Sequence, residues 1–525
     1  MLKFKLTENG QFIKLVDFSL NSEKTSLIRY FKKKSKKAAF NVMVDRGLWD
    51  GMDAFITKEG LIAVGLWREI YAFAEKTGYE VEVEGIEQFT NKNIRREKYL
   101  EYVENLLDGI TDEHGNPIIP RDYQFEASFR ASKYKFCTQE LATSAGKTLI
   151  FFIYNSFLRD AKKISKTNKS LIIVPNISLV GQTAEKFIMY AQPDKQWSVC
   201  TIGGKDKFKQ EKFDDAEIVI STYQSLVNLN PNLFKVFSVV QVDEVHKGRA
   251  ASIRDILVQC SNWEYRLGLS GTVKIEEEFS DFFRVQEIVG PLVMTLSAKH
   301  LIDHGYSPNI KIDILDLKYD EASPQIQKYW HLKKTGKSMY NNAKDFGRDM
   351  LAIEKGIIFD SKERLDFISN FTQKLGKNTL ILFSDVKNGY GKMIQDKLLE
   401  WNDKVFYIDG GVDSKDRDKF KETLEAEDGV IIVASYNTFA TGIDSKRLYH
   451  IVLSESIKSE IILRQAIGRG MRKLAEKNKV MVWDLVDQLD GYSVKHAKIR
   501  EDIYKEQKFP INHRLVDLTK KRPTE

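Results

Sequence analysis

Short apolar segments recur along most of this chain and are separated by stretches with helical periodicity. In the first half, near-continuous apolar runs occupy residues 170–174, 216–220, 236–242 and 265–270. Strands of a parallel sheet that is covered by helices on both faces are buried on both sides, and this burial produces such runs. The pattern therefore predicts an α/β domain built on a parallel sheet.

The same alternation starts again in the second half, after Gly305–Asn309, where Pro308 interrupts the pattern. Residues 350–376 have helical periodicity. Apolar segments then follow at 379–383, 404–408, 429–433, 450–453 and 480–483. A second parallel α/β domain is therefore expected.

Residues 1–97 follow a different pattern. Residues 78–84 alternate polar with apolar side chains, as in a half-exposed strand, and 66–74 place apolar residues at helical spacing. A small α+β domain is expected here. A connecting helix at 98–107 and a glycine- and proline-containing loop at 112–120 come next. We therefore expect domains at 1–97, 98–307 and 308–495, followed by a carboxy-terminal tail at 496–525, of which the charged segment from Lys505 to Glu525 is expected to be peripheral.

Composition restricts the class of protein. At roughly 150 residues per domain, 525 residues suggest three to four domains. The 81 Lys and Arg against 74 Asp and Glu give a net charge of +7, which permits nucleic-acid binding without demonstrating it. Cys137, Cys200 and Cys260 lie too far apart in sequence for a zinc motif, and an odd number disfavours a disulfide framework. No apolar run approaches the roughly 18 residues of a membrane span, so a cytoplasmic protein without a membrane partner is expected.

Residues 141–148, Leu-Ala-Thr-Ser-Ala-Gly-Lys-Thr, form the strongest candidate site. Successive backbone N–H groups before a helix can bind phosphate oxygens, Lys147 can neutralise the β and γ phosphates, and Thr148 can ligate magnesium. Leu141 stands where the usual pattern has glycine, so a plain helix start with an extended lysine is the alternative. The candidate nucleotide-binding residues are Thr143, Ser144, Ala145, Gly146, Lys147 and Thr148.

A second motif, which is acidic, follows a predicted strand at Asp243-Glu244-Val245-His246. Phosphoryl transfer needs a carboxylate that holds the metal and a group that orients the attacking water. We assign the first role to Asp243 and the second to Glu244. The alternative is a pair of solvent-facing acids at a strand end.

An arginine-rich segment lies in the second predicted domain, at residues 464–472. Arg469 and Arg472 are three residues apart, so on a helix they would share a face. They could act as arginine fingers, which stabilise the charge of the transferred phosphate. A solvated or phosphate-contacting surface is the alternative.

A basic run lies in the amino-terminal domain and comprises Lys32, Lys33, Lys34, Lys36 and Lys37. A glycine-bracketed turn that presents Trp49 follows it. Lysines bind phosphates and an aromatic ring stacks on bases, so the run is a candidate nucleic-acid contact. A solvated face is the alternative.

In this order, the motifs resemble those of the superfamily 2 helicases and translocases, from about Arg121 to Trp483. The resemblance implies two tandem RecA-like domains and gives Gln124 a role in adenine recognition. It assigns backbone-gripping loops to Pro175, Asn176, Gly203, Gly204 and Thr222. It assigns the coupling of ATP state to strand grip to His246, Ser270, Gly271 and Thr272. Gly442 and Asp444 lie in the corresponding loop of the second domain and are candidate nucleotide-binding residues, and Gln465 is a candidate catalytic residue of the arginine-finger segment.

A narrower resemblance extends over almost the whole chain. The turn at 47–51, the loop at 143–147, and the segments 434–436 and 439–442 are similar to those of the UvsW-type phage helicases. Those enzymes unwind, anneal and migrate branched DNA. The resemblance implies that residues 1–97 engage DNA and that, if the protein is phage-encoded, it acts in the host cytoplasm.

The sequence thus predicts an α/β enzyme, an ATP- and Mg²⁺-dependent DNA helicase or translocase, expected to be a monomer. An RNA helicase is the nearest alternative, because backbone-gripping motifs do not reveal the sugar. A clamp that binds ATP without hydrolysing it is another alternative. The combination of Lys147, Asp243, Glu244, Gln465, Arg469 and Arg472 argues against the clamp.

Overall fold

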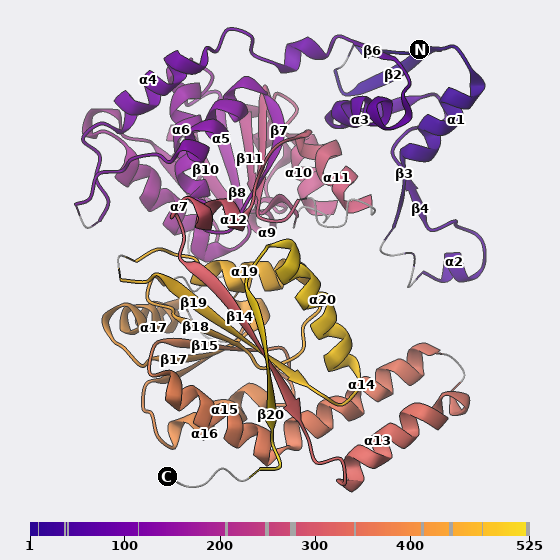
Figure 1. The fold of residues 1–525 in the computed structure, drawn as a ribbon. Coiled ribbons are helices and arrows are strands. Elements are labelled where there is room, and N and C mark those ends of the chain that lie inside the picture. Colours follow the sequence, from indigo (N-terminus) through magenta and orange to yellow (C-terminus); the bar gives the residue numbers. More distant parts are fainter. Residues whose placement is uncertain are drawn as a thin grey trace. The chain divides into compact units, whose positions relative to one another are not determined.

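The chain divides into two compact units in the computed structural model, residues 1–296 and residues 297–525 (Figure 1). The structure describes residues 1–520 except Asn9, 36–37, 39–40, His114, 205–207, 247–250, 274–279, 341–342, 411–413, 440–444 and Ala475. Within the described residues, no helix combines the length and apolar character needed to cross a membrane.

The first unit begins with a small mixed sheet in the order β5-β2-β1-β6. Strand β1 pairs antiparallel with β2 and parallel with β6, and its alternate residues Leu2 and Phe4 are buried. A separate ribbon of β3 and β4 leads to the short helix α2 (Figure 1). The elements are β1 (Leu2–Leu6), β2 (Phe12–Phe18), α1 (Asn21–Tyr30), β3 (Lys32–Lys34), α2 (Val42–Asp45), β4 (Met52–Ala54), β5 (Leu61–Ala63), α3 (Trp67–Thr77) and β6 (Val81–Glu84).

This small sheet domain packs on helix α11 (Ser280–Val289) of the same unit. The rings of Tyr30, Phe31 and Phe55 lie 5.2–6.3 Å from the ring of Phe283. Arg68 donates to the carbonyl of Leu292 at 3.4 Å. The amino-terminal domain and the following domain therefore share one hydrophobic core.

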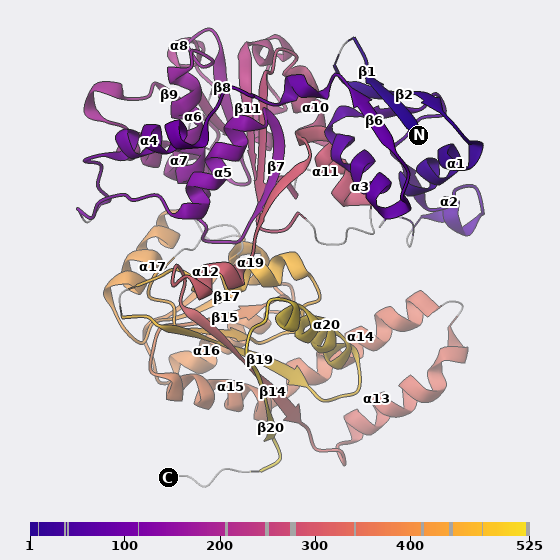
Figure 2. The ribbon, with the colours of Figure 1, turned by 45° about the horizontal axis from the view of Figure 1, so that its top comes forward.

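The larger sheet of the first unit has seven parallel strands in the order β13-β7-β12-β11-β8-β10-β9. Helices lie on both of its faces (Figure 2), which explains why every residue of β7 and β8 is buried. Helix α4 (Arg96–Leu107) leads to α5 (Asp122–Lys133), β7 (Phe136–Leu141), α6 (Lys147–Asp160), β8 (Lys169–Val174), α7 (Ile177–Tyr190), β9 (Val199–Ile202), α8 (Gln210–Asp215), β10 (Ile218–Thr222), α9 (Tyr223–Leu226), β11 (Phe237–Asp243), α10 (Ala251–Gln259), β12 (Tyr265–Ser270), α11 and β13 (Leu292–Leu296).

The second unit contains another parallel sheet of seven strands, in the order β16-β17-β15-β18-β19-β14-β20. Helices α13 and α14 extend from it as a pair (Figures 1 and 2). Its elements are α12 (Ala298–Asp303), β14 (Asn309–Lys318), α13 (Pro324–Thr335), α14 (Ala343–Asp360), α15 (Lys362–Leu375), β15 (Thr379–Phe383), α16 (Tyr390–Leu399), β16 (Val405–Ile408), α17 (Ser414–Ala426), β17 (Ile431–Ser435), α18 (Tyr436–Phe439), β18 (His450–Leu453), α19 (Glu460–Gly470), β19 (Lys479–Asp487), α20 (Tyr492–Glu506) and β20 (Ile511–Asp517).

The expectations of a separate tail at 496–525 and of a peripheral segment from Lys505 are wrong. Residues 496–506 continue helix α20, and β20 pairs in parallel with β14 over Ile312–Lys318. Charged composition was misleading here because Arg500 is buried and forms a bidentate ion pair with Asp484 at 2.7 and 2.8 Å. The carboxy-terminal segment is therefore part of the second sheet.

The two units divide after Leu296, earlier than the boundary expected at 307. Helix α12 belongs to the second unit and buries Leu301, whose carbonyl accepts hydrogen bonds from the N–H groups of Tyr306 and Ser307. The turn at Gly305, with φ of 67°, therefore lies inside the second unit and does not form a linker.

Candidate nucleotide-binding site

The predicted phosphate loop connects the end of β7 to the start of α6. Leu141 is fully buried as the last residue of the strand, so the turn itself comprises residues 142–146. Ser144 and Gly146 have φ of 68° and 73°. A β-carbon on Gly146 would lie 2.3 Å from Nε2 of Gln124, so glycine is needed at this position. Position 141 lies inside the strand, so it does not need glycine.

Gln124 fixes the loop from helix α5. Its Nε2 donates to the carbonyl of Ala145 at 2.9 Å, and its Oε1 accepts from the N–H of Arg121 at 2.9 Å. The side chain is buried. Gln124 therefore links the start of α5 to the phosphate loop.

Lys147 lies between the two acidic residues at the end of β11. Its Nζ is 3.2 Å from Oδ1 of Asp243 and donates to Oε1 of Glu244. Burial by itself lowers the pKa of Lys147, but the charges of Asp243 and Glu244 outweigh burial and raise it. Burial raises the pKa of Asp243. The ammonium group is thus held charged beside the two carboxylates.

The residues predicted to couple ATP state to strand grip meet beside Glu244. Nδ1 of His246 lies 2.6 Å from Oγ of Ser270, 3.1 Å from Oγ1 of Thr272 and 3.3 Å from Oε2 of Glu244. A β-carbon on Gly271 would lie 3.4 Å from Oγ1 of Thr143. The segment after β12 therefore contacts both the acidic motif and the phosphate loop.

These residues fit a magnesium–nucleotide complex. The described residues contain no group of three or more His, Cys, Asp and Glu side chains that could hold a metal by itself. Magnesium in such sites is commonly bound by one or two carboxylates together with substrate phosphates. Thr148 and Asp243 would hold the metal. The glycine turn and Lys147 would contact the phosphates.

The predicted backbone-gripping residues come together at the carboxyl ends of three adjacent strands. Pro175 and Asn176 follow β8, Gly203 and Gly204 follow β9, and Thr222 ends β10. The order β8-β10-β9 places these ends side by side. Asn176 and Thr222 cap α7 and α9 through their side chains, so their side-chain oxygens already have structural roles.

The arginine segment lies on helix α19 of the second unit, but the helix ends at Gly470. Gln465 is buried and Arg469 is half-buried on the helix, whereas Arg472 is exposed beyond it. The expectation that the two arginines share a helical face is therefore wrong. The buried ammonium of Lys477 donates to the carbonyl of Gly470 at 2.9 Å and helps to end the helix there.

The predicted residues Gly442 and Asp444, and Lys36 and Lys37 of the basic run, lie outside the described residues. The remaining lysines of the run form strand β3. Nζ of Lys32 is 3.3 Å from Asp50, and Nζ of Lys33 lies 4.4 Å from the centroid of the Phe283 ring. Lys34 is exposed.

The turn at 47–51 presents different side chains from the one expected. Trp49 is half-buried, and its Nε1 donates to the carbonyl of Met52 at 2.9 Å. Three apolar residues near it are exposed instead, Val42 to 57%, Met43 to 48% and Leu48 to 66%. We call Val42, Met43 and Leu48 the apolar tip. The sequence signal for the tip is Leu48, an apolar residue that directly follows Gly47 in the turn closed by Gly51.

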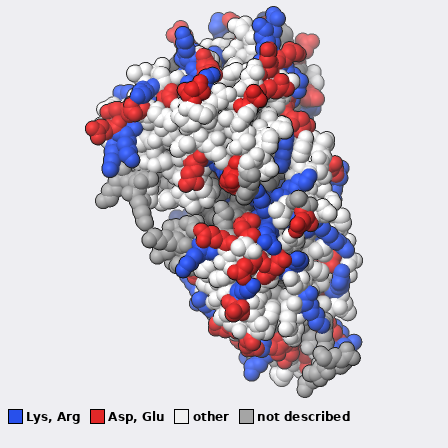
Figure 3. Space-filling view, turned by 90° about the vertical axis from the view of Figure 1, so that its left-hand side faces the viewer, with Lys and Arg blue, Asp and Glu red and all other residues white. Residues whose placement is uncertain are grey.

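The face drawn in Figure 3 has no broad basic patch. On the face drawn in Figure 3, lysines and arginines are interspersed with acidic residues. This pattern agrees with the small excess of positive charge over the whole chain, 81 Lys and Arg against 74 Asp and Glu.

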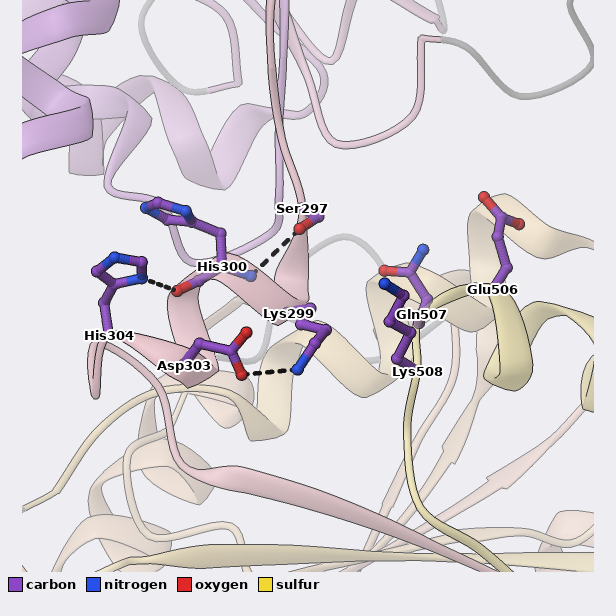
Figure 4. Close-up of a pocket in the computed structure, with 8 residues that line it drawn as sticks. All are labelled: Ser297, Lys299, His300, Asp303, His304, Glu506, Gln507 and Lys508. Atoms are coloured by element: carbon purple, nitrogen blue, oxygen red, sulfur yellow. Dashed lines mark hydrogen bonds and ion pairs between the residues drawn. The ribbon is translucent and has the colours of Figure 1, made fainter.

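A cavity of about 410 Å³ in the second unit lies between helix α12 and residues 506–508 (Figure 4). The lining residues of α12 and the residues beside it bond to one another: Lys299 pairs with Asp303 at 2.8 Å, and Nδ1 of His304 lies 2.9 Å from the carbonyl of His300. None of the predicted site residues lines it.

Comparisons with known families match both units. Residues 103–275 match the family described as "Type III restriction enzyme, res subunit". Residues 363–473 match the family described as "Helicase conserved C-terminal domain". The first range contains the phosphate loop and the acidic motif, and the second contains helix α19.

Two phage proteins are similar over long stretches. The chain is 28% identical over 499 residues to the ATP-dependent DNA helicase UvsW of Enterobacteria phage T4, covering 91% of this chain and 93% of that protein. It is 26% identical over 344 residues to "Probable helicase D10" of Escherichia phage T5, covering 64% of this chain and 66% of that protein.

A solved structure supports the fold. S. cerevisiae Dbp5 bound to RNA and ADP BeF3 covers 79% of this chain and 95% of its own, with 15% identity and a TM-score of 0.51. At this identity the likeness concerns the fold alone. The expected fold class, two tandem RecA-like parallel sheets with a small amino-terminal domain, is confirmed.

Proposed function

Because the chain belongs to the superfamily 2 helicases and is of the UvsW type, we propose that it is an ATP-dependent DNA helicase or translocase acting on branched or forked DNA. In this proposal it unwinds, anneals and migrates junctions during phage recombination, repair or replication. The T4 relative is a DNA helicase by name, and the similarity covers 91% of this chain. That extent supports a shared substrate class.

The first unit would bind and activate ATP. Magnesium would neutralise phosphate charge, and Thr148 and Asp243 would hold it. Lys147 would exchange its contacts with Asp243 and Glu244 for the β and γ phosphates. Glu244, freed of that ion pair, would orient the attacking water and accept its proton.

The second unit would complete hydrolysis. Arg469 and Arg472 would stabilise the charge of the transferred phosphate, with Gln465 contributing from the same segment. Gly442 and Asp444 would bind on the nucleotide side. Arg469 lies on the helix and Arg472 lies beyond its end, so the first would approach the phosphate from a helical backbone and the second from a non-helical one.

Coupling to DNA would run through the segment after β12. Ser270 and Thr272 contact His246, which lies 3.3 Å from Glu244. A change at Glu244 on ATP binding would therefore reach this segment directly. The gripping loops at Pro175–Asn176, Gly203–Gly204 and Thr222 would hold the strand backbone through main-chain groups, because the side chains of Asn176 and Thr222 cap helices.

The amino-terminal domain would engage DNA beside the motor domains. Exposed Lys34 offers a phosphate contact, and the exposed apolar tip can pack on bases at a branch point. Lys32 and Lys33 are bound to protein groups, so their part in DNA binding would require exchange of those contacts. Trp49 would act mainly by holding the turn.

The ion pairs of Lys147 with Asp243 and Glu244 beside a glycine turn carry this proposal. ATP hydrolysis should be measured with single-stranded, duplex, forked and four-way DNA and with matched RNA. We expect the largest stimulation with forked or four-way DNA. Greater stimulation by RNA would identify an RNA helicase, and ATP binding without stimulated turnover would identify a clamp.

A further inference from the structure

A second cavity of about 410 Å³ in the second unit is separate from the residues assigned to ATP and strand binding. Its walls come from helix α14, the loop between β18 and α19, and the start of α20. Leu351, Phe359, Ile457 and Tyr492 provide apolar and aromatic surface. The volume lies within the range of about 300–1,000 Å³ that small-molecule sites occupy.

The cavity lies at the topological switch point of the second sheet. Strands β15 and β18 are neighbours, and the chain runs from β15 to β16 on one side of the sheet and from β18 to β19 on the other. Asp385 follows β15 and Glu455 follows β18. Ligands of open α/β sheets bind outside the carboxyl ends of the strands at this point.

Two buried arginines and a tyrosine hold the loop that forms one wall. Arg364 donates to the carbonyl of Ser454 at 2.7 Å, and Arg500 donates to the carbonyl of Ile457 at 3.0 Å. The hydroxyl of Tyr436 donates to the carbonyl of Glu455 at 3.0 Å. These contacts fix the wall before any ligand arrives, as a preorganised site requires.

The arginines are themselves costly to bury. Asp487 pairs with Arg364 at 2.6 Å, and Asp484 pairs with Arg500 at 2.7 Å. All four side chains are at most 1% exposed. Buried ion pairs contribute little net stability, so the geometry that they impose on this loop is the clearer consequence.

Glu455 gives the cavity a polar end. Its side chain is 4% exposed, and its Oε1 accepts from the N–H of Asp385 at 3.2 Å. Oε2 has no hydrogen-bond partner among the described residues, with Nζ of Lys355 4.0 Å away. Burial raises the pKa of Glu455. An N–H donor on a ligand would satisfy this oxygen.

Positive charge also lies along the lining. Lys355 and exposed Lys458 both line the cavity, and Nζ of Lys355 also pairs with Oδ2 of Asp385 at 3.3 Å. The acidic Glu354 and Asp487 line it too, and each is bonded to a protein group. His496 lines it as well, and burial lowers its pKa to about 4, so it is neutral near pH 7. Apolar and aromatic walls, the buried Oε2 of Glu455 without a hydrogen-bond partner among the described residues, and adjacent ammonium groups together fit a flat heterocycle that carries an amino group and a phosphate.

We propose that this cavity binds a nucleobase of the DNA strand. The base would lie between the apolar walls with its amino group at Glu455, and the phosphate of the same nucleotide would lie near Lys355 and Lys458. The inference rests on the proposed function and deepens it. Residues 455–459 lead directly into α19, whose first turn is capped by Ser459. Base occupancy would therefore act on the segment that carries Arg469.

The test compares single-stranded DNA of one length with and without bases, without ATP, on the full chain. Deoxyadenosine and abasic oligonucleotides are titrated by fluorescence anisotropy. We expect wild type to bind the adenine strand about tenfold more tightly than the abasic strand. Glu455→Gln keeps the oxygen that accepts from the N–H of Asp385 and replaces Oε2 by an NH2 donor, and Leu351→Trp fills the cavity from α14. In both variants the ratio of the affinity for the adenine strand to the affinity for the abasic strand should fall to within about twofold of unity. The affinity for the abasic strand should be unchanged.

Glu422→Gln, at an exposed glutamate of α17, is the matched control and should keep the wild-type ratio. Unfolding temperatures show whether Leu351→Trp folds, and the isosteric Glu455→Gln keeps the test valid if it does not. An unchanged ratio in Glu455→Gln overturns the proposal.

Adenosine monophosphate provides the second arm, titrated by calorimetry into Lys147→Ala to suppress binding at the phosphate loop. Binding that disappears on adding Glu455→Gln, with the strand ratio unaffected, would assign the cavity to free nucleotide and overturn the strand assignment. A helicase failure is distinguishable, because absent DNA-stimulated ATP hydrolysis would leave this binding ratio measurable.

Discussion

At the scale of single residues, the site depends on contacts that each side chain makes before ATP binds. Lys147 is held between two carboxylates, and Gln124 bonds to the backbone of the phosphate loop. His246 contacts both the acidic motif and the segment after β12. Three separate motifs therefore meet within one unit around the proposed phosphate site.

Replacing Lys147 by alanine should abolish nucleic-acid-stimulated ATP hydrolysis, because it removes the proposed phosphate contact. The loss should be at least about 100-fold, corresponding to roughly 2.7 kcal/mol of transition-state stabilisation. Steady-state hydrolysis with saturating forked DNA measures it. Lys162→Ala, at a lysine just beyond the end of the same helix, is the control. Near-normal turnover in Lys147→Ala would remove the active-site assignment.

His450 should make the second unit sensitive to acid. Burial lowers its pKa from 6.5 to about 4, and its Nδ1 accepts from Nε1 of Trp483 at 3.1 Å. Between pH 6.5 and about pH 4 the unfolded chain binds more protons than the folded chain, so the free energy of unfolding falls as the pH drops through this range.

In His450→Gln this loss should be smaller, by on the order of 1 kcal/mol after allowance for partial exposure. Denaturant unfolding at pH 7 and pH 5 measures the difference. Equal losses in the variant and wild type would show that His450 does not carry this sensitivity.

The candidate site could be predicted from sequence where chemistry depends on residue order. The phosphate loop and the acidic motif are short, ordered patterns, and the structure brings them together. Side-chain contacts could not be predicted in the same way. Lys33 looks like a surface lysine until the ring of Phe283, 250 residues later in the chain, is placed beneath it.

At the scale of elements, the strands of both parallel sheets followed from their apolar runs, whereas shorter or more polar strands did not. Strand β7, Phe-Cys-Thr-Gln-Glu-Leu, is fully buried although half of it is polar. Gln139 bonds to the carbonyl of Ala127 at 2.8 Å, a long-range contact that no local pattern reveals. Strand β20 was missed for the related reason that its neighbours in sequence are charged.

Truncation of the carboxy-terminal elements tests this correction. Removing residues 491–525 deletes α20 and β20 and leaves Asp484 buried without Arg500, at a cost of about 3–5 kcal/mol in the free energy of unfolding. Thermal unfolding should show that the second unit is lost or strongly destabilised. Removing only residues 521–525 is the control. An unchanged melting profile in the longer truncation would restore the view of this segment as peripheral.

The apolar tip gives a second test at this scale. Leu48→Ser combined with Met43→Ser should weaken binding to forked DNA several-fold without affecting stability, because both side chains are exposed. Anisotropy with forked DNA measures it. Ile119→Ser, at an exposed residue outside this domain, is the control. Unaltered affinity in the double variant would assign the tip to ordinary solvated surface.

At the scale of the whole molecule, the proposed function requires both units. The first contains the phosphate loop and the acidic motif, and the second contains the arginine segment on α19. Each unit has its own parallel sheet of seven strands. Neither unit has the full set of proposed catalytic residues, so hydrolysis and strand movement should depend on residues from both.

ATP-dependent conversion of forked DNA tests this claim most directly. Strand separation and annealing of a labelled fork are followed with wild type, Lys147→Ala and Arg469→Ala, with ATP binding measured in parallel. The account predicts that wild type converts the fork, that both variants lose conversion, and that Arg469→Ala still binds ATP. Conversion by either variant, or by wild type without ATP, would contradict a motor whose catalytic residues come from two units.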